Sequence, residues 1–323
     1  MRTRNYHIPD SALLYRVVIL LLVLLSAGVV LFANVQDASQ EGLLHSKICL
    51  WFPNTSIRYL LGGTLCVFAS ILMYGLNNAY TIIKARSSLH SVLFLLFYMA
   101  FFLKIINIEG LLIVLLLALS LLALFSAYAS ENAPISIFLT HVCLGFSLLI
   151  LPALVWLILF YFLFFFVFRI AAWQTLSAAI MGLSMAFIFF FAYAVYTEQM
   201  FLFEDYFKQL FYIDLMPLSI LPQLQRWQLL ILFILLLWSS FRYIKVRYRV
   251  KIRVRVYLDF IILFSFSLVV LINLYPLLAP LLLPSLLMGV SFFIGRFLSF
   301  SRRKIDTIVV FLFFLSIMIF SLI

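Results

Sequence analysis

Long apolar runs are the feature that most constrains how this chain can fold. The run LLYRVVILLLVLLSAGVVLFA, for example, contains one charged residue, Arg16. About 20 apolar residues in a helix cross the roughly 30 Å of hydrocarbon in a bilayer. Strands of a membrane barrel would instead alternate apolar and polar residues, which these runs do not. The sequence therefore predicts an all-α fold, a polytopic transmembrane helical bundle.

The composition leaves no room for a separate soluble domain. The 323 residues are 67% hydrophobic and 10% charged, whereas a soluble domain is about half apolar and about a quarter charged. We therefore expect residues 1–323 to form a single membrane domain with about eleven spans (10–12). The expected spans are 12–34, 58–82, 88–107, 109–128, 135–151, 153–168, 172–196, 227–241, 255–275, 277–297 and 304–323. Three joints, at KIINIEG, Pro152 and Pro276, are each either a turn between spans or a kink within one.

The basic residues predict the orientation, because lysine and arginine concentrate in short cytoplasmic loops. With the N-terminus in the cytoplasm, 17 of the 22 basic residues fall on the cytoplasmic side. Residues 35–57 then form a first outer loop and residues 197–226 a large outer loop.

The segment RYIKVRYRVKIRVR, residues 242–255, is predicted to be a polybasic cytoplasmic loop. We expect its cations to act as a topology anchor and to attract anionic lipid head groups. Basic residues alternate with apolar ones, so we expect an extended segment that lies along the head groups. No nucleic acid is expected as a partner, since no folded reader or aromatic platform accompanies the charges. The basic residues of the segment are Arg242, Lys245, Arg247, Arg249, Lys251, Arg253 and Arg255.

Ionisable residues within the spans are rare and mark intramembrane polar contacts. We expect His141 to bond a neighbouring helix, and Asp259 to pair with Arg255 one turn away. The series Pro276, Pro280 and Pro284 makes its span a candidate broken helix. The sequence predicts neither a metal site nor a cofactor.

Acidic residues on the outer side are the candidates for catalysis. Asp37 and Glu41 lie in the first outer loop, where a carboxylate could serve as general base toward an acceptor hydroxyl. The large outer loop interleaves aromatic and charged residues, which predicts an amphipathic segment on the membrane surface. Enzymes that take sugars from lipid-linked donors at the outer face share this general plan.

Two stretches, LNNAYTIIKARSSLHSVLFLLFY and the segment from Leu124 to Tyr196, carry a resemblance to a family. Arg169, Trp173 and Gly182 contribute much of it. The chain resembles uncharacterised polytopic inner-membrane proteins of Bacteroidota of about 300 residues. The resemblance implies a Gram-negative inner membrane and no particular reaction.

The sequence thus predicts an integral inner-membrane protein of unassigned activity, with cell-envelope assembly as the broadest hypothesis. One alternative is a glycosyltransferase or polymerase that acts on polyprenyl-linked sugars at the outer face. The other is a transporter or a non-catalytic subunit with an unknown membrane partner.

Overall fold

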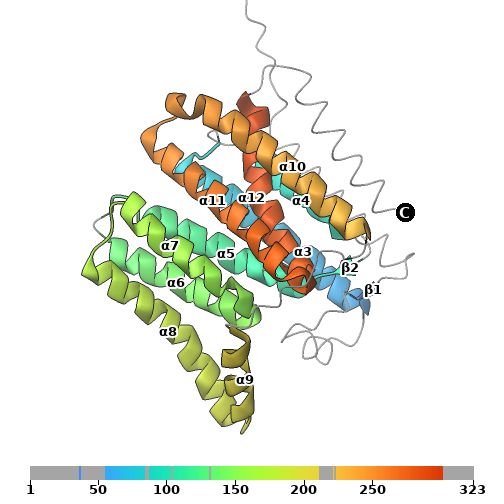
Figure 1. Cartoon of the computed structure of the whole chain (residues 1–323), viewed down its shortest axis with the longest axis vertical. Coiled ribbons are helices and arrows are strands. Elements are labelled where there is room, and N and C mark those ends of the chain that lie inside the picture. The colour runs from blue at the N-terminus through green and yellow to red at the C-terminus, as the bar shows by residue number, and fades with distance from the viewer. Residues whose placement is uncertain are drawn as a thin grey trace, which may run out of the picture.

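The computed structural model describes residues 36–37, 55–83, 87–102, 105–130, 132–210, 221 and 223–300. Helices dominate this part of the chain, and the predicted all-α class is confirmed. Two two-residue strands form a single parallel pair (Figure 1). In chain order the elements are β1 Gln36–Asp37, α3 Thr55–Tyr80, α4 Leu89–Phe102, β2 Ile105–Ile106, α5 Ile108–Ser126, α6 Ala133–Ile150, η1 Pro152–Leu154, α7 Val155–Val167, α8 Trp173–Tyr196, α9 Met200–Leu210, α10 Gln223–Val246, η3 Arg247–Arg249, α11 Ile252–Leu274, η4 Pro276–Leu278 and α12 Ala279–Phe300, where η marks a 3₁₀ turn.

Seven helices in the described ranges are long and apolar enough to cross a membrane. They are α3, α5, α6, α8, α10, α11 and α12. Helices α4 and α7 are apolar but shorter, with 14 and 13 residues, or roughly 20 Å. Each predicted span between residues 58 and 297 overlaps one helix, whereas the predicted spans 12–34 and 304–323 lie outside the described residues. The count of about eleven spans therefore stays a prediction.

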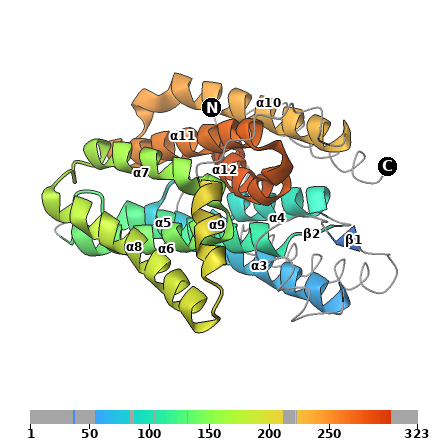
Figure 2. The ribbon, with the colours of Figure 1, turned by 60° about the horizontal axis from the view of Figure 1, so that its bottom comes forward.

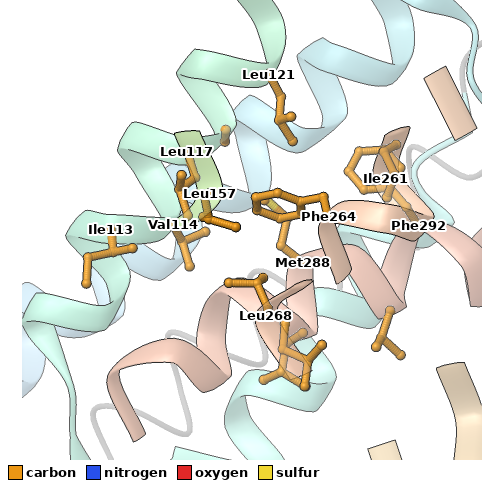
Figure 3. Packing of buried hydrophobic residues seen from close by; sticks show 14 of the residues in the cluster. Ile113, Val114, Leu117, Leu121, Leu157, Ile261, Phe264, Leu268, Met288 and Phe292 are labelled. Carbon is orange, nitrogen blue, oxygen red and sulfur yellow. The ribbon is translucent and has the colours of Figure 1, made fainter. Parts of the chain in front are cut away.

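Helix α12 lies at the centre of the bundle. It contacts α4, α5, α10 and α11, and 89% of its most apolar stretch is buried, against 28% for α8. Phe264 and Leu268 of α11 meet Met288 and Phe292 of α12 beside α5 (Figure 3). Side chains from α5, α11 and α12 pack together there, so the core is built around α12.

Proline corners connect two pairs of helices. The 3₁₀ turn η1 separates α6 from α7, and η4 separates α11 from α12. Both proline joints are therefore turns between helices. Pro284 lies inside α12, which continues as helix to Phe300. The predicted broken helix is thus wrong, because α12 stays helical through this position.

Aromatic residues join several helices at one end of the bundle. The Tyr80 hydroxyl at the end of α3 donates to the Leu122 carbonyl of α5, at 2.7 Å. The Tyr257 hydroxyl near the start of α11 donates to the Phe125 carbonyl, at 3.0 Å. Phe168, at the end of α7, packs on Tyr257. The ends of α3, α5 and α7 therefore share one side with the start of α11, as the alternation of predicted spans requires.

Helix α9 folds back along the end of α8 (Figure 2). Phe203 packs on Phe190 and Phe191, and Tyr206 packs on Phe187. The buried Tyr206 hydroxyl donates to the Leu148 carbonyl of α6 at 2.7 Å, and burial raises the pKa of this phenol. The amphipathic segment expected in 197–226 is therefore a helix over Met200–Leu210, while residues 211–220 and 222 lie outside the described part.

Candidate functional site

The polybasic segment forms a helical hairpin. Helix α10 continues to Val246, a 3₁₀ turn covers Arg247–Arg249, and α11 begins at Ile252. Only Val250 and Lys251 have extended backbone, with ψ angles of 141° and 140°. The predicted extended segment over 242–255 is therefore wrong. Both flanking spans keep their helical hydrogen bonds almost to the turn, which overrides the two-residue alternation.

Asp259 anchors the hairpin through a different arginine from the one expected. Its carboxylate accepts hydrogen bonds from the Arg247 guanidinium and from the Tyr243 hydroxyl, the latter at 3.0 Å. The expected partner Arg255 instead donates to the Val250 carbonyl at 3.2 Å. Because α11 starts only at Ile252, the chain turns back and brings Arg247 of the preceding turn to Asp259. The predicted Arg255–Asp259 pair is wrong.

The remaining basic residues of the segment differ in whether they contact aromatic side chains of the protein or lie exposed at the turn. Arg253 donates to the Tyr257 hydroxyl at 2.6 Å and lies over the Tyr128 ring. Arg242 lies over Trp238 and Phe297, and Lys245 lies over Phe241. Arg249 and Lys251, at the tip of the turn, are exposed. The hairpin therefore combines inward-facing arginines with an outward-facing cationic tip.

His141 lies in the middle of α6, with its ring fully buried. Its Nδ1 atom is 2.9 Å from the Ile137 carbonyl of the same helix, and Nε2 has no hydrogen-bond partner in the described part of the chain. The ring contacts Phe162 and Phe165 of α7. The predicted hydrogen bond to another helix is therefore not formed, because aromatic side chains occupy the facing surface.

At the opposite end of the bundle, β1 brings Asp37 to the start of α5. Gln36 and Asp37 pair in parallel with Ile105 and Ile106. Paired strands lie about 4.8 Å apart, so the Asp37 backbone lies beside the segment that leads into α5. The second candidate, Glu41, lies outside the described residues.

Three buried polar residues accompany this strand pair or the helices beside it. Asn107 is 3% exposed and Glu109 4% exposed at the start of α5, and Arg58 is 7% exposed near the start of α3, which packs along α5. Asn107 Oδ1 accepts the Gly110 amide at 2.8 Å, and Nδ2 donates to the Pro280 carbonyl of α12. Buried ionisable and polar groups in a membrane protein are costly and usually have a function.

Sequence reasoning placed Asp37 on this side of the membrane but missed Asn107 and Glu109. The joint KIINIEG was considered only as a turn or kink. The available signal was a carboxylate, Glu109, at the first residue of the predicted span 109–128. Within the described ranges, His, Cys, Asp and Glu side chains form no group of three that could hold a metal ion.

The helices define a class of protein, the multi-pass helical membrane proteins. Comparison of the chain with protein-family models, with curated proteins and with solved structures finds no match.

Proposed function

We propose that the chain is an inner-membrane enzyme of cell-envelope assembly that transfers sugars from a polyprenyl-linked donor. In this proposal the polybasic hairpin lies in the cytoplasm and Asp37 lies at the outer face. Asp37 is the general base that accepts the proton of the acceptor hydroxyl while the hydroxyl oxygen forms a bond to the anomeric carbon of the sugar. The bond from that carbon to the lipid phosphate oxygen breaks, and the polyprenyl-linked phosphate leaves with the electron pair. Its position beside the start of α5 is the observation that carries the proposal.

The surroundings of Asp37 favour a reaction at this end of the bundle. A general base acts only if the backbone that carries it is held in place, and pairing with Ile105–Ile106 holds β1. Asn107 fixes the segment that follows β2 to both α5 and α12. The buried Glu109 adds a second carboxylate-bearing residue three positions beyond the partner of Asp37.

The surface helix α9 also favours a lipid-linked compound as the substrate. It places aromatic side chains at the same end of the bundle as η1 and the end of α6. Aromatic residues on a short amphipathic helix suit the boundary between head groups and acyl chains. A sugar on a long isoprenoid would reach the protein along that boundary.

Replacement of Asp37 by Asn tests the proposal. Membranes from cells with wild-type or D37N protein are extracted, and polyprenyl-linked saccharides are measured by mass spectrometry. We expect D37N to accumulate the unprocessed lipid-linked sugar while protein level and unfolding temperature stay unchanged. The matched control is Asp259→Asn at the opposite end, which should not cause accumulation. Identical saccharide profiles for D37N and wild type would reject Asp37 as the base.

One observation favours a second candidate, a non-catalytic subunit. Helix α8 contacts α6 and α9 and leaves a broad apolar side exposed. That side carries Trp173, Ile180, Ile188 and Phe189, and another membrane helix could pack there as well as lipid. Native mass spectrometry of the gently purified protein decides this point. A stoichiometric second protein that dissociates in an Ile180→Ser/Ile188→Ser variant would support the subunit role.

A further inference from the structure

The hairpin between α10 and α11 has more cations than its own carboxylate can neutralise. Arg247 is the cation paired with Asp259 in the described part of the chain. Lys245, Arg249 and Lys251 are exposed and form no salt bridge there. The charge at this tip is therefore available to a ligand.

Exposed apolar side chains lie directly among these cations. Tyr248 is 84% exposed and Ile252 is 70% exposed, and Ile244 precedes Lys245 on the surface of α10. A soluble anion would gain nothing from these side chains. An amphiphile with an anionic head and acyl chains would contact both kinds of residue.

The start of α11 adds to the attraction for an anion. Its first turn has no acidic residue, and no side chain caps the free amides. These amides carry the positive end of the helix dipole. Lys251 at the cap and Arg253 in the first turn increase that positive potential.

We propose that the turn from Lys245 to Ile252 is a binding site for an anionic phospholipid. The phosphodiester lies against Arg249 and Lys251, and the acyl chains pass Ile244 of α10 and Ile252 of α11. Asp259 and Tyr243 hold Arg247 inward and thereby set the shape of the turn. The site is independent of the reaction proposed for the other end.

The test uses the full-length protein in nanodiscs that contain phosphatidylcholine with a minor fraction of phosphatidylglycerol. Native mass spectrometry measures how much of each lipid stays bound. We expect wild type to retain phosphatidylglycerol selectively and an Arg249→Gln/Lys251→Gln variant to lose that selectivity by roughly thirtyfold, since each basic residue near the surface contributes about a factor of five.

A matched control removes two exposed cations at the opposite end, Lys208→Gln/Arg226→Gln, and should retain phosphatidylglycerol as wild type does. Equal loss in both variants would show a general charge effect and overturn the site. Inorganic phosphate tests whether a free anion competes with the lipid head group for this site. We expect 10 mM phosphate, roughly the strength of a common buffer, to leave the lipid bound. Full displacement of the lipid by phosphate would overturn the phospholipid assignment, and so would unchanged selectivity in the double variant.

Discussion

Asn107 supplies the Pro280 carbonyl with the hydrogen bond that the α12 backbone cannot provide. In a regular helix this carbonyl would accept the amide of residue 284, but Pro284 has no N–H. Asn107 Nδ2 lies 2.5 Å from the carbonyl oxygen. Its Oδ1 meanwhile accepts the Gly110 amide. One side chain thus repairs α12, caps α5 and joins the two helices.

We therefore expect Asn107→Leu to destabilise the protein by about 1–3 kcal/mol, because it leaves a buried carbonyl and a buried amide without partners. Asn107→Asp keeps the acceptor for Gly110 but places a buried carboxylate oxygen against the Pro280 carbonyl oxygen, so at neutral pH its cost should be at least as large. The unfolding free energy of the purified protein in detergent measures both changes.

A double variant tests the role of Pro284 directly. Pro284→Ala restores an amide at the position that normally serves the Pro280 carbonyl. The cost of Asn107→Leu should consequently fall in the Pro284→Ala background, with a coupling of about 0.5–3 kcal/mol. Strictly additive effects would mean that the carbonyl does not depend on Asn107.

Gly182 allows α6 and α8 to approach closely. A Cβ atom there would lie 2.5 Å from the Phe138 carbonyl oxygen, whereas one at Gly75 would meet nothing within 4 Å. Gly182→Ala should destabilise the protein by about 1–3 kcal/mol through overpacking. Gly75→Ala, the control, should be neutral or stabilising through helix propensity. Thermal unfolding compares them, and equal unfolding temperatures would contradict this packing.

The Asp259 partner can be checked by two double-mutant cycles. Side chains of Arg247 and Asp259 are 44% and 22% exposed, so solvent screens the pair and we expect a coupling of at most about 1 kcal/mol. Arg247→Gln should couple to Asp259→Asn, and Arg255→Gln should not. A larger coupling with Arg255 would restore the i+4 pair that the sequence predicts.

The orientation is tested with fused reporters. A reporter active only in the cytoplasm should work when the chain is cut and fused after Arg249, and one active only in the periplasm should work after Glu198. We expect this result because cations concentrate on the cytoplasmic side. Opposite activities would reverse the orientation and place Asp37 inside the cell.

The length of the apolar runs was sufficient to predict most helices of the described residues. The spans around α5, α8 and α11 needed only their length and composition, since each helix must satisfy its own backbone in lipid. Joints were harder. A proline shows that a regular helix is interrupted, but whether Pro152 begins a turn and Pro284 remains inside a helix depends on neighbours distant in sequence, such as Asn107.

The candidate sites were less predictable, for a related reason. Asp259 was identified correctly as a polar contact, but its partner depends on where α11 begins, which the basic alternation obscured. His141 was expected to bond another helix, but the facing side chains from α7 are aromatic. The position of Asp37 beside the segment that leads into α5 follows from a strand pair across almost seventy residues of chain, which no local pattern encodes.

The central position of α12 has a consequence for biogenesis. Helices α4 and α5, which contact α12, leave the ribosome long before residues 279–300 exist, because synthesis runs from the N-terminus. Until α12 is inserted, the surfaces of these helices that face it lie against lipid or a chaperone. A premature stop before Ala279 would therefore leave inserted helices without the central helix against which they pack. We expect membrane proteases to degrade such a truncated protein.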